Sequence, residues 1–153
     1  MTKYRALDIE ELQALEKEFV DFLVLNGIIG DDWVKMKETD PAAATKMTEL
    51  FSDVVWEGIL RKIQYLDFRS PQSIKCFQCL AEEIIMVSMD SETLDLTSAD
   101  FELIKSGEKA SEVQVYTAKK QYSKVREEEL YDMLGWGCER SEGGLFKSLC
   151  LLL

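Results

Sequence analysis

The chain has 153 residues, with 18 basic and 29 acidic side chains, a net charge of −11, no histidine and an apolar fraction of 46%. The missing histidine excludes Ser-His-Asp and Cys-His catalysis and any histidine-bearing zinc site. The acidic charge disfavours nucleic-acid binding, because that affinity depends on Lys and Arg neutralising phosphates. Length and composition predict a single α+β domain of residues 1–153 that buries its own core.

No targeting or membrane segment is apparent in the sequence. The first twenty residues carry many charges and no apolar run, which is unlike a secretion signal or a transit peptide. The longest uncharged stretch, residues 22–30, is far shorter than the roughly 20 residues that span a bilayer. We therefore expect a cytoplasmic protein with reduced cysteines and no membrane partner. No cofactor is expected either, since no glycine-rich phosphate loop is present.

The first predicted element is an amphipathic helix. Asp8 and Glu11 have the spacing of a capping box, in which each side chain accepts a hydrogen bond from the other residue's backbone. Apolar residues then recur every three or four positions as far as Leu23, which places them on one helix face. Gly27 is a suitable residue to end the helix.

Two further helices are predicted in the N-terminal part of the chain. A short one carries Trp33, and a long one begins at Asp40-Pro41, where a capping residue precedes proline at the first helical position. The apolar stripe of the long helix continues to about Tyr65. The sequence therefore predicts that residues 1–66 are helical.

The middle of the chain, residues 67–117, is predicted to be mainly strand and loop. Residues 73–80 and 84–89 have the composition and spacing of a hairpin, and residues 112–117 alternate as a third strand would. A turn of helix is expected around residues 100–104. The result is a small antiparallel sheet of about three strands.

The last part of the chain, residues 118–153, is predicted to be helical. One helix ends at Gly135, and a short terminal helix follows Ser141. The order of the elements is thus N-terminal helices, a small sheet and C-terminal helices, which is an α+β fold.

A set of fragments is spread over the chain: Tyr4-Arg5 before the helix of residues 7–23, Leu50-Phe51-Ser52-Asp53, Tyr65-Leu66, Arg69-Ser70-Pro71, residues 126–130, and Ser141 with Gly143 and Leu145-Phe146. Together they resemble a small, functionally uncharacterised bacterial family, a domain of unknown function. The resemblance covers most of the chain and is weakest over residues 90–112. It implies a bacterial cytosolic protein and brings no known activity.

Cys76 and Cys79 form a C-x-x-C pair, which occurs both in metal sites and in redox couples. The only further cysteines are Cys138 and Cys150, whose spacing is unlike the second short-spaced pair of a structural zinc site. The pair also lies in a predicted strand, where side chains three positions apart point to opposite faces. The sequence favours buried structural cysteines over a metal or redox site.

Three acidic residues, Asp90, Glu92 and Asp95, lie close together in a predicted loop. Carboxylates are the ligands of Mg²⁺ and Ca²⁺, but the glycine and the terminal glutamate of an EF-hand loop are missing. These residues are weak metal candidates. They support one alternative function, a carboxylate-based metal-dependent enzyme.

A basic and aromatic cluster follows the third predicted strand: Tyr116, Lys119, Lys120, Tyr122, Lys124 and Arg126. Such interleaving can stack nucleic-acid bases in a basic groove. Three glutamates follow directly, so we expect salt bridges within a helix and no nucleic-acid partner.

The C-terminal part of the chain carries the predicted interface. Trp136 lies between two glycines and is either a contact anchor or a core residue. The final nine residues are almost all apolar, with Leu145, Phe146, Leu149 and Leu152 among them, and must be buried. The sequence therefore predicts a non-enzymatic binding or assembly protein that forms a homodimer through these residues, and its acidic charge also suits a basic protein partner.

Overall fold

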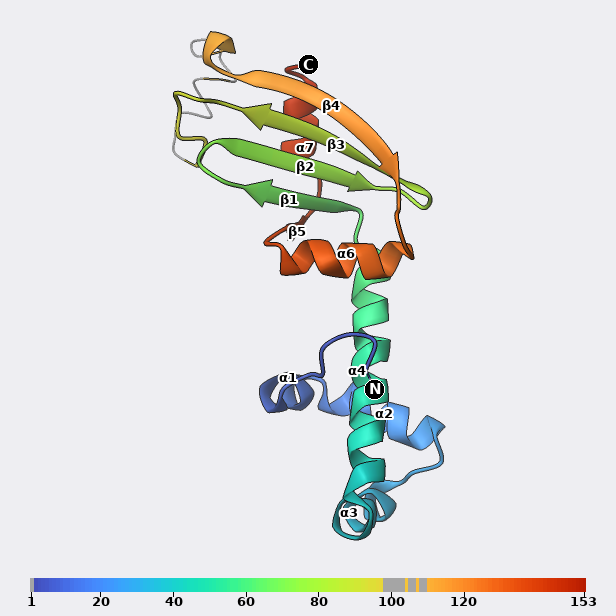
Figure 1. The fold of residues 1–153 in the computed structure, drawn as a ribbon. Coiled ribbons are helices and arrows are strands. Elements are labelled where there is room, and N and C mark those ends of the chain that lie inside the picture. Colours follow the sequence, from blue (N-terminus) through green and yellow to red (C-terminus); the bar gives the residue numbers. More distant parts are fainter. Residues whose placement is uncertain (1, 98–103, 105–106, 108–109) are drawn as a thin grey trace. The chain divides into compact units, whose positions relative to one another are not determined.

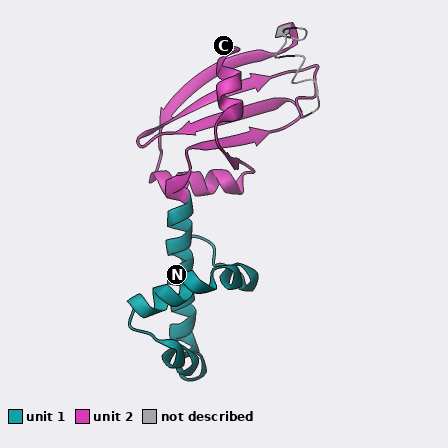
Figure 2. Cartoon of the chain, turned by 180° about the vertical axis from the view of Figure 1, so that it is seen from behind, with its two compact units in different colours: residues 1–59 teal, residues 60–153 magenta. Residues whose placement is uncertain are grey.

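The computed structural model describes residues 2–97, 104, 107 and 110–153, and the chain forms two compact units, residues 1–59 and residues 60–153 (Figure 2). The first unit is helical, and the second combines a sheet with helices. Among the described helices, none has both the length and the apolar composition needed to cross a membrane.

The first unit contains α1 (Ile9–Ala14), α2 (Glu16–Leu25), α3 (Gly30–Thr39) and most of α4 (Pro41–Lys62) (Figure 1). The predicted capping box of Asp8 and Glu11 is confirmed, with backbone-to-carboxylate distances of 2.8 and 3.0 Å. The predicted single helix is two, because the backbone of Leu15 leaves the helical region at φ −110° and ψ 26°. Gly27 follows α2 at φ 78°, a conformation that suits glycine.

Aromatic side chains form the centre of this unit. The ring of Phe51, on α4, lies 4.9 Å from that of Phe19 and 5.4 Å from that of Phe22, both on α2. Trp33 of α3 contacts the same group, 5.3 Å from Phe19. The long helix begins at Pro41 as predicted, so its first half supplies the surface on which the shorter helices pack.

The described part of the second unit holds a five-stranded antiparallel sheet in the order β4-β3-β2-β1-β5. The strands are β1 (Tyr65–Arg69), β2 (Ser73–Cys79), β3 (Glu83–Asp90), β4 (Gln114–Gln121) and β5 (Glu139–Ser141). The other elements are the short 3₁₀ helix η1 (Ala110–Glu112), α6 (Arg126–Gly135) and α7 (Gly144–Cys150). The α+β class and the β2–β3 hairpin are confirmed.

The prediction of about three strands was wrong. β1 begins where the long helix was expected to end, and β5 lies in the part predicted to be helical. β5 has three residues, too few for a periodic pattern, and forms because Leu66 of β1 pairs with Arg140. β4 continues to Gln121, since lysines are well tolerated on an edge strand. Of the helical turn predicted around residues 100–104, all but Ile104 lie outside the described residues.

The predicted terminal helix is present as α7 and covers one face of the sheet (Figure 1). Its buried Phe146 and Leu149 join a core with Ile74 and Cys76 of β2 and Val87 of β3. Because side chains alternate along a strand, the neighbours of these core residues point to the opposite face. That second face holds the candidate site.

Candidate functional site

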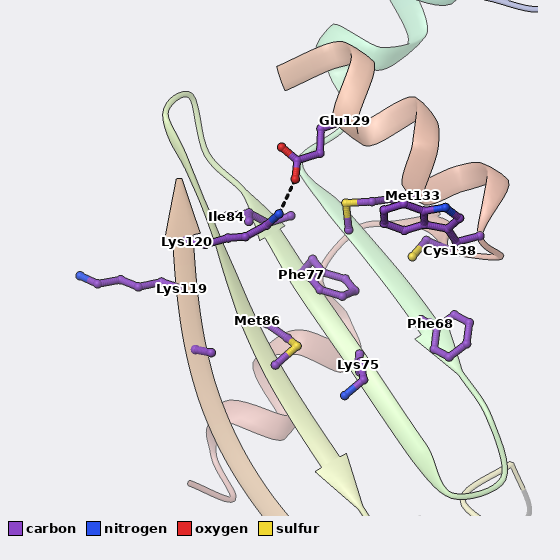
Figure 3. A pocket seen from close by; sticks show the side chains of 12 residues that line it. Phe68, Lys75, Phe77, Ile84, Met86, Lys119, Lys120, Glu129, Met133 and Cys138 are labelled. Carbon is purple, nitrogen blue, oxygen red and sulfur yellow. Dashed lines mark hydrogen bonds and ion pairs between the residues drawn. The ribbon is translucent and has the colours of Figure 1, made fainter. Parts of the chain in front are cut away.

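The face of the sheet opposite α7 carries a pocket of about 470 Å³, which we call the sheet pocket (Figure 3). It is lined by Phe68, Lys75, Phe77, Ile84, Met86, Ala118, Lys119, Lys120, Glu129, Met133, Trp136 and Cys138. All of these residues belong to the second unit. Strands β1 to β4 provide the floor and α6 provides one wall.

The register of the strands produces the apolar floor. Phe77 of β2 lies between Leu66 of β1 and Met86 of β3, and Met86 is paired in turn with Ala118 of β4. Leu66 is buried, whereas Phe77 and Met86 remain half-buried. A row of large apolar side chains is therefore left partly open to solvent on a sheet whose other face is covered.

Helix α6 closes the pocket at one end through Glu129 and Met133, which are both buried. The helix ends at Gly135 as predicted, and Trp136 follows it at the rim, where 70% of its surface is exposed. Gly137 has φ 107°, and this left-handed turn brings Cys138 back to the pocket wall.

Glu129 is the one carboxylate among the residues that line the sheet pocket, and it is only 4% exposed. It forms an ion pair with Lys120 of β4 and accepts a hydrogen bond from the backbone N–H of Ser123 at 2.8 Å. Burial alone would raise the pKa of Glu129, but these hydrogen bonds and the Lys120 charge lower it below its ordinary value. The α6 end of the pocket thus contains a compensated pair of charges.

We expect this lowered pKa to make stability depend on pH. The contribution of Glu129 to the free energy of unfolding is fully present above its ordinary pKa of 4.5. It is lost as the pH falls through the lower pKa of the folded state. Urea unfolding between about pH 6 and pH 3 should show this loss of stability. In Glu129→Gln, the free energy of unfolding should depend less on pH over the same range. The exposed Glu139→Gln is the control, and an unchanged slope in Glu129→Gln would contradict the prediction.

At the other end of the pocket, Lys75 begins a hydrogen-bonded network. Its ammonium donates to the hydroxyl of Ser88 at 3.1 Å and to that of Tyr116 at 3.4 Å. Ser88 in turn donates to Oδ1 of Asp90 at 3.1 Å, and Ser73 donates to the same oxygen at 2.6 Å. Burial would raise the pKa of Asp90, but the bonds from these hydroxyls and the Lys75 charge lower it.

The three predicted carboxylates do not converge on one point. Asp90 and Glu92 line a polar cavity of about 730 Å³ beside the network, and Asp95 is not part of that lining. Oδ1 of Asp95 instead accepts hydrogen bonds from Thr97, which lower the pKa of Asp95. Within the described residues, no group of three or more Cys, Asp or Glu side chains is arranged to hold a metal ion.

The cysteine pair is divided between the two faces of the sheet, as the strand period predicts. Cys76 lies in the core with α7, and Cys79 is also buried. Burial raises the pKa of both thiols, that of Cys79 to about 12. Cys138 contributes to the raised pKa of Cys79, and Cys150 contributes to that of Cys76, because each lies near the other thiol. Each face of the sheet therefore holds two of the four free cysteines.

The residues predicted to form an interface lie in different places. Phe146 and Leu149 are buried under the sheet of their own chain, and Leu145 and Leu152 pack partly buried against the same core. Trp136 lies at the rim of the sheet pocket instead.

The basic and aromatic cluster is engaged within the second unit. Lys120 and Lys124 form ion pairs with Glu129 and Asp132 of α6, and Arg126 turns inward to backbone carbonyls. Burial raises the pKa of Tyr122 to about 12, and its hydroxyl donates to the carbonyl of Leu80 at 2.8 Å.

Fold and pocket together define an α+β protein with an apolar cavity on one sheet face. The chain belongs to a family of unknown function, DUF6495, whose model matches residues 1–153. The resemblance to such a family is therefore confirmed over the whole chain. No curated protein and no solved structure matches this chain.

Proposed function

We propose that the protein is a binding module that holds an apolar ligand in the sheet pocket. The observation that carries the proposal is the row of large, half-buried apolar side chains, Phe77 and Met86 above all, on an open sheet face. Exposed apolar surface of this kind costs free energy unless something covers it. A volume of about 470 Å³ falls in the range of sites for small molecules.

The polar groups of the pocket support binding rather than catalysis. Glu129 is already paired with Lys120, and the Ser88 hydroxyl beside Lys75 is fully buried, out of reach of a substrate. The alternative of a metal-dependent enzyme has no supporting cluster of ligands among the described residues. The four free thiols support the cytosolic location predicted from the sequence.

Binding can be measured with decanol, a neutral apolar probe, by the change in tryptophan emission, with Trp136→Phe identifying the reporter. We expect saturable binding to the full chain. Met86→Gln keeps the volume of the side chain but removes apolar contact, and should weaken binding about 5- to 10-fold. Leu151→Gln is the matched control, because Leu151 follows α7 on the other face and is 87% exposed. Equal effects of the two substitutions, or no saturable binding, would refute the proposal.

Self-association is the second candidate function. The exposed indole of Trp136 and the exposed Leu151 and Leu153 are apolar groups of the kind that protein interfaces cover. Light scattering of the purified chain should then give the mass of a dimer, which Trp136→Ser converts to a monomer. The net charge of −11 likewise supports a basic protein partner.

A further inference from the structure

We infer that the ligand of the sheet pocket is an amphiphile with an anionic head group, held by the ammonium group of Lys75. The inference rests on the binding function proposed above and names the class of ligand. It follows from the position of Lys75, its unused donor and the distribution of charge along the pocket.

Lys75 stands where the apolar and polar parts of the sheet face meet. It lines the sheet pocket and also the polar cavity that contains Asp90 and Glu92. Figure 3 shows its side chain at the end of the pocket away from α6, beyond Phe77 and Met86. A ligand that fills the apolar part therefore ends beside this ammonium group.

The ammonium group has a donor to spare. It carries three N–H donors, of which Ser88 and Tyr116 take two, at 3.1 and 3.4 Å. Both partners are neutral hydroxyls, and no described carboxylate lies within the 4.0 Å of an ion pair with Lys75. A half-buried cation with neutral partners and one unused proton is suited to receive an anion.

The opposite end of the pocket has no comparable cation directed into it. There Lys120 is paired with the buried Glu129, and the side chain of Lys119 points away from the pocket in Figure 3. Lys75 is therefore the cation on the pocket side that has no ion-pair partner among the described residues, which orients the ligand with its head at Lys75 and its chain towards Met133. The strand segment from Lys75 to Cys79 spans roughly 13 Å, the length of a medium-chain molecule.

Asp90 provides a second test, in which a substitution should strengthen binding of the anion. Its carboxylate is separated from Lys75 by the Ser88 hydroxyl, which accepts from Lys75 and donates to Asp90. The negative charge of Asp90 still lies close enough to repel an anionic head. Asp90→Asn keeps the shape and removes that charge, so it should strengthen binding of the anion.

The experiment compares decanoate with decanol, both as free monomers, by calorimetric titration of the full chain. We expect decanoate to bind about 10-fold more tightly than decanol. Lys75→Met should abolish this preference for decanoate, whereas Asp90→Asn should increase it. Lys147→Met is the matched control, because it removes the same charge from an exposed lysine of α7, on the other face of the sheet.

The outcomes separate this inference from the proposed function. Saturable decanol binding with no preference for decanoate would overturn the anionic head and leave the apolar site standing. An equal loss of the preference for decanoate in Lys147→Met and in Lys75→Met would attribute that preference to general charge, and would also overturn the anionic head. In a further outcome, the chain sediments with anionic phospholipid vesicles in a Lys75-dependent way while monomeric decanoate does not bind. That result would overturn the free amphiphile as the ligand.

Discussion

Replacing Arg126 by alanine is expected to lower the free energy of unfolding by about 3 kcal/mol, because several backbone carbonyls lose a charged donor at once. The guanidinium donates to the carbonyls of Leu60 and Cys79 at 3.2 and 3.1 Å, and also to that of Ile63. Its Nε donates to the carbonyl of Leu80 at 3.1 Å. One side chain thus joins the end of α4, the β2–β3 turn and the start of α6.

The geometry explains why arginine is needed at this position. The last carbonyls of α4 have no partner within the helix, and a cation at the C-terminus of a helix also interacts favourably with its dipole. Lysine would keep the charge but has no planar fork of donors that can reach separate carbonyls. Arg126→Lys should therefore lose most of the same stability.

Urea unfolding followed by circular dichroism measures both variants. Arg69→Ala is the matched control, because Arg69 is an exposed arginine at the end of β1 in the same unit, and we expect a change within about 0.5 kcal/mol. If Arg126→Lys were as stable as the parent chain, the charge alone would be sufficient and the role of the fork would be disproved.

The second large effect is expected at Gly143, where alanine should destabilise the chain by about 3 kcal/mol. Gly143 precedes α7 at φ 88°, which is unfavourable for any residue with a Cβ. A Cβ there would also lie 2.7 Å from the ring of Tyr65. The ring has little room to move, because it packs against Phe146, with 5.6 Å between the ring centroids.

The neighbouring glycine provides the control. Gly144 begins α7, and a Cβ added there would meet nothing within 4 Å. Gly144→Ala should leave stability unchanged or raise it slightly, because alanine favours the helix. Thermal unfolding of the two variants side by side tests the argument, and similar melting temperatures would show that the Tyr65 contact and the left-handed backbone matter little.

Local signals predicted much of the fold. Asp8 with Glu11 and Asp40 with Pro41 identified helix starts, since capping depends on residues a few positions apart. β5 could not be predicted in this way, because its three residues become a strand only through pairing with β1, far away in the chain. Pairing between distant segments leaves no periodic signal in either segment.

The candidate site was harder to predict than the fold. The sequence pointed to acidic residues and cysteines, whereas the sheet pocket depends on Lys75, Phe77 and Met86, which carry no chemical motif. One signal was available: residues 84–87 of β3 are apolar on both faces, which requires a cover on each. The strand order was needed to show that α7 covers one face and that the pocket occupies the other.

Helix α7 follows the strands that it covers, and this order has a consequence for synthesis on the ribosome. The β2–β3 hairpin is local in sequence, but the face of the sheet that carries Ile74 and Val87 is closed only by Phe146 and Leu149. Until those residues have left the ribosome, the growing sheet exposes an apolar surface that neighbouring chains can bind. The interval between translation of β3 and of α7 is therefore the period in which aggregation competes with folding, and slow codons within it would lengthen that exposure.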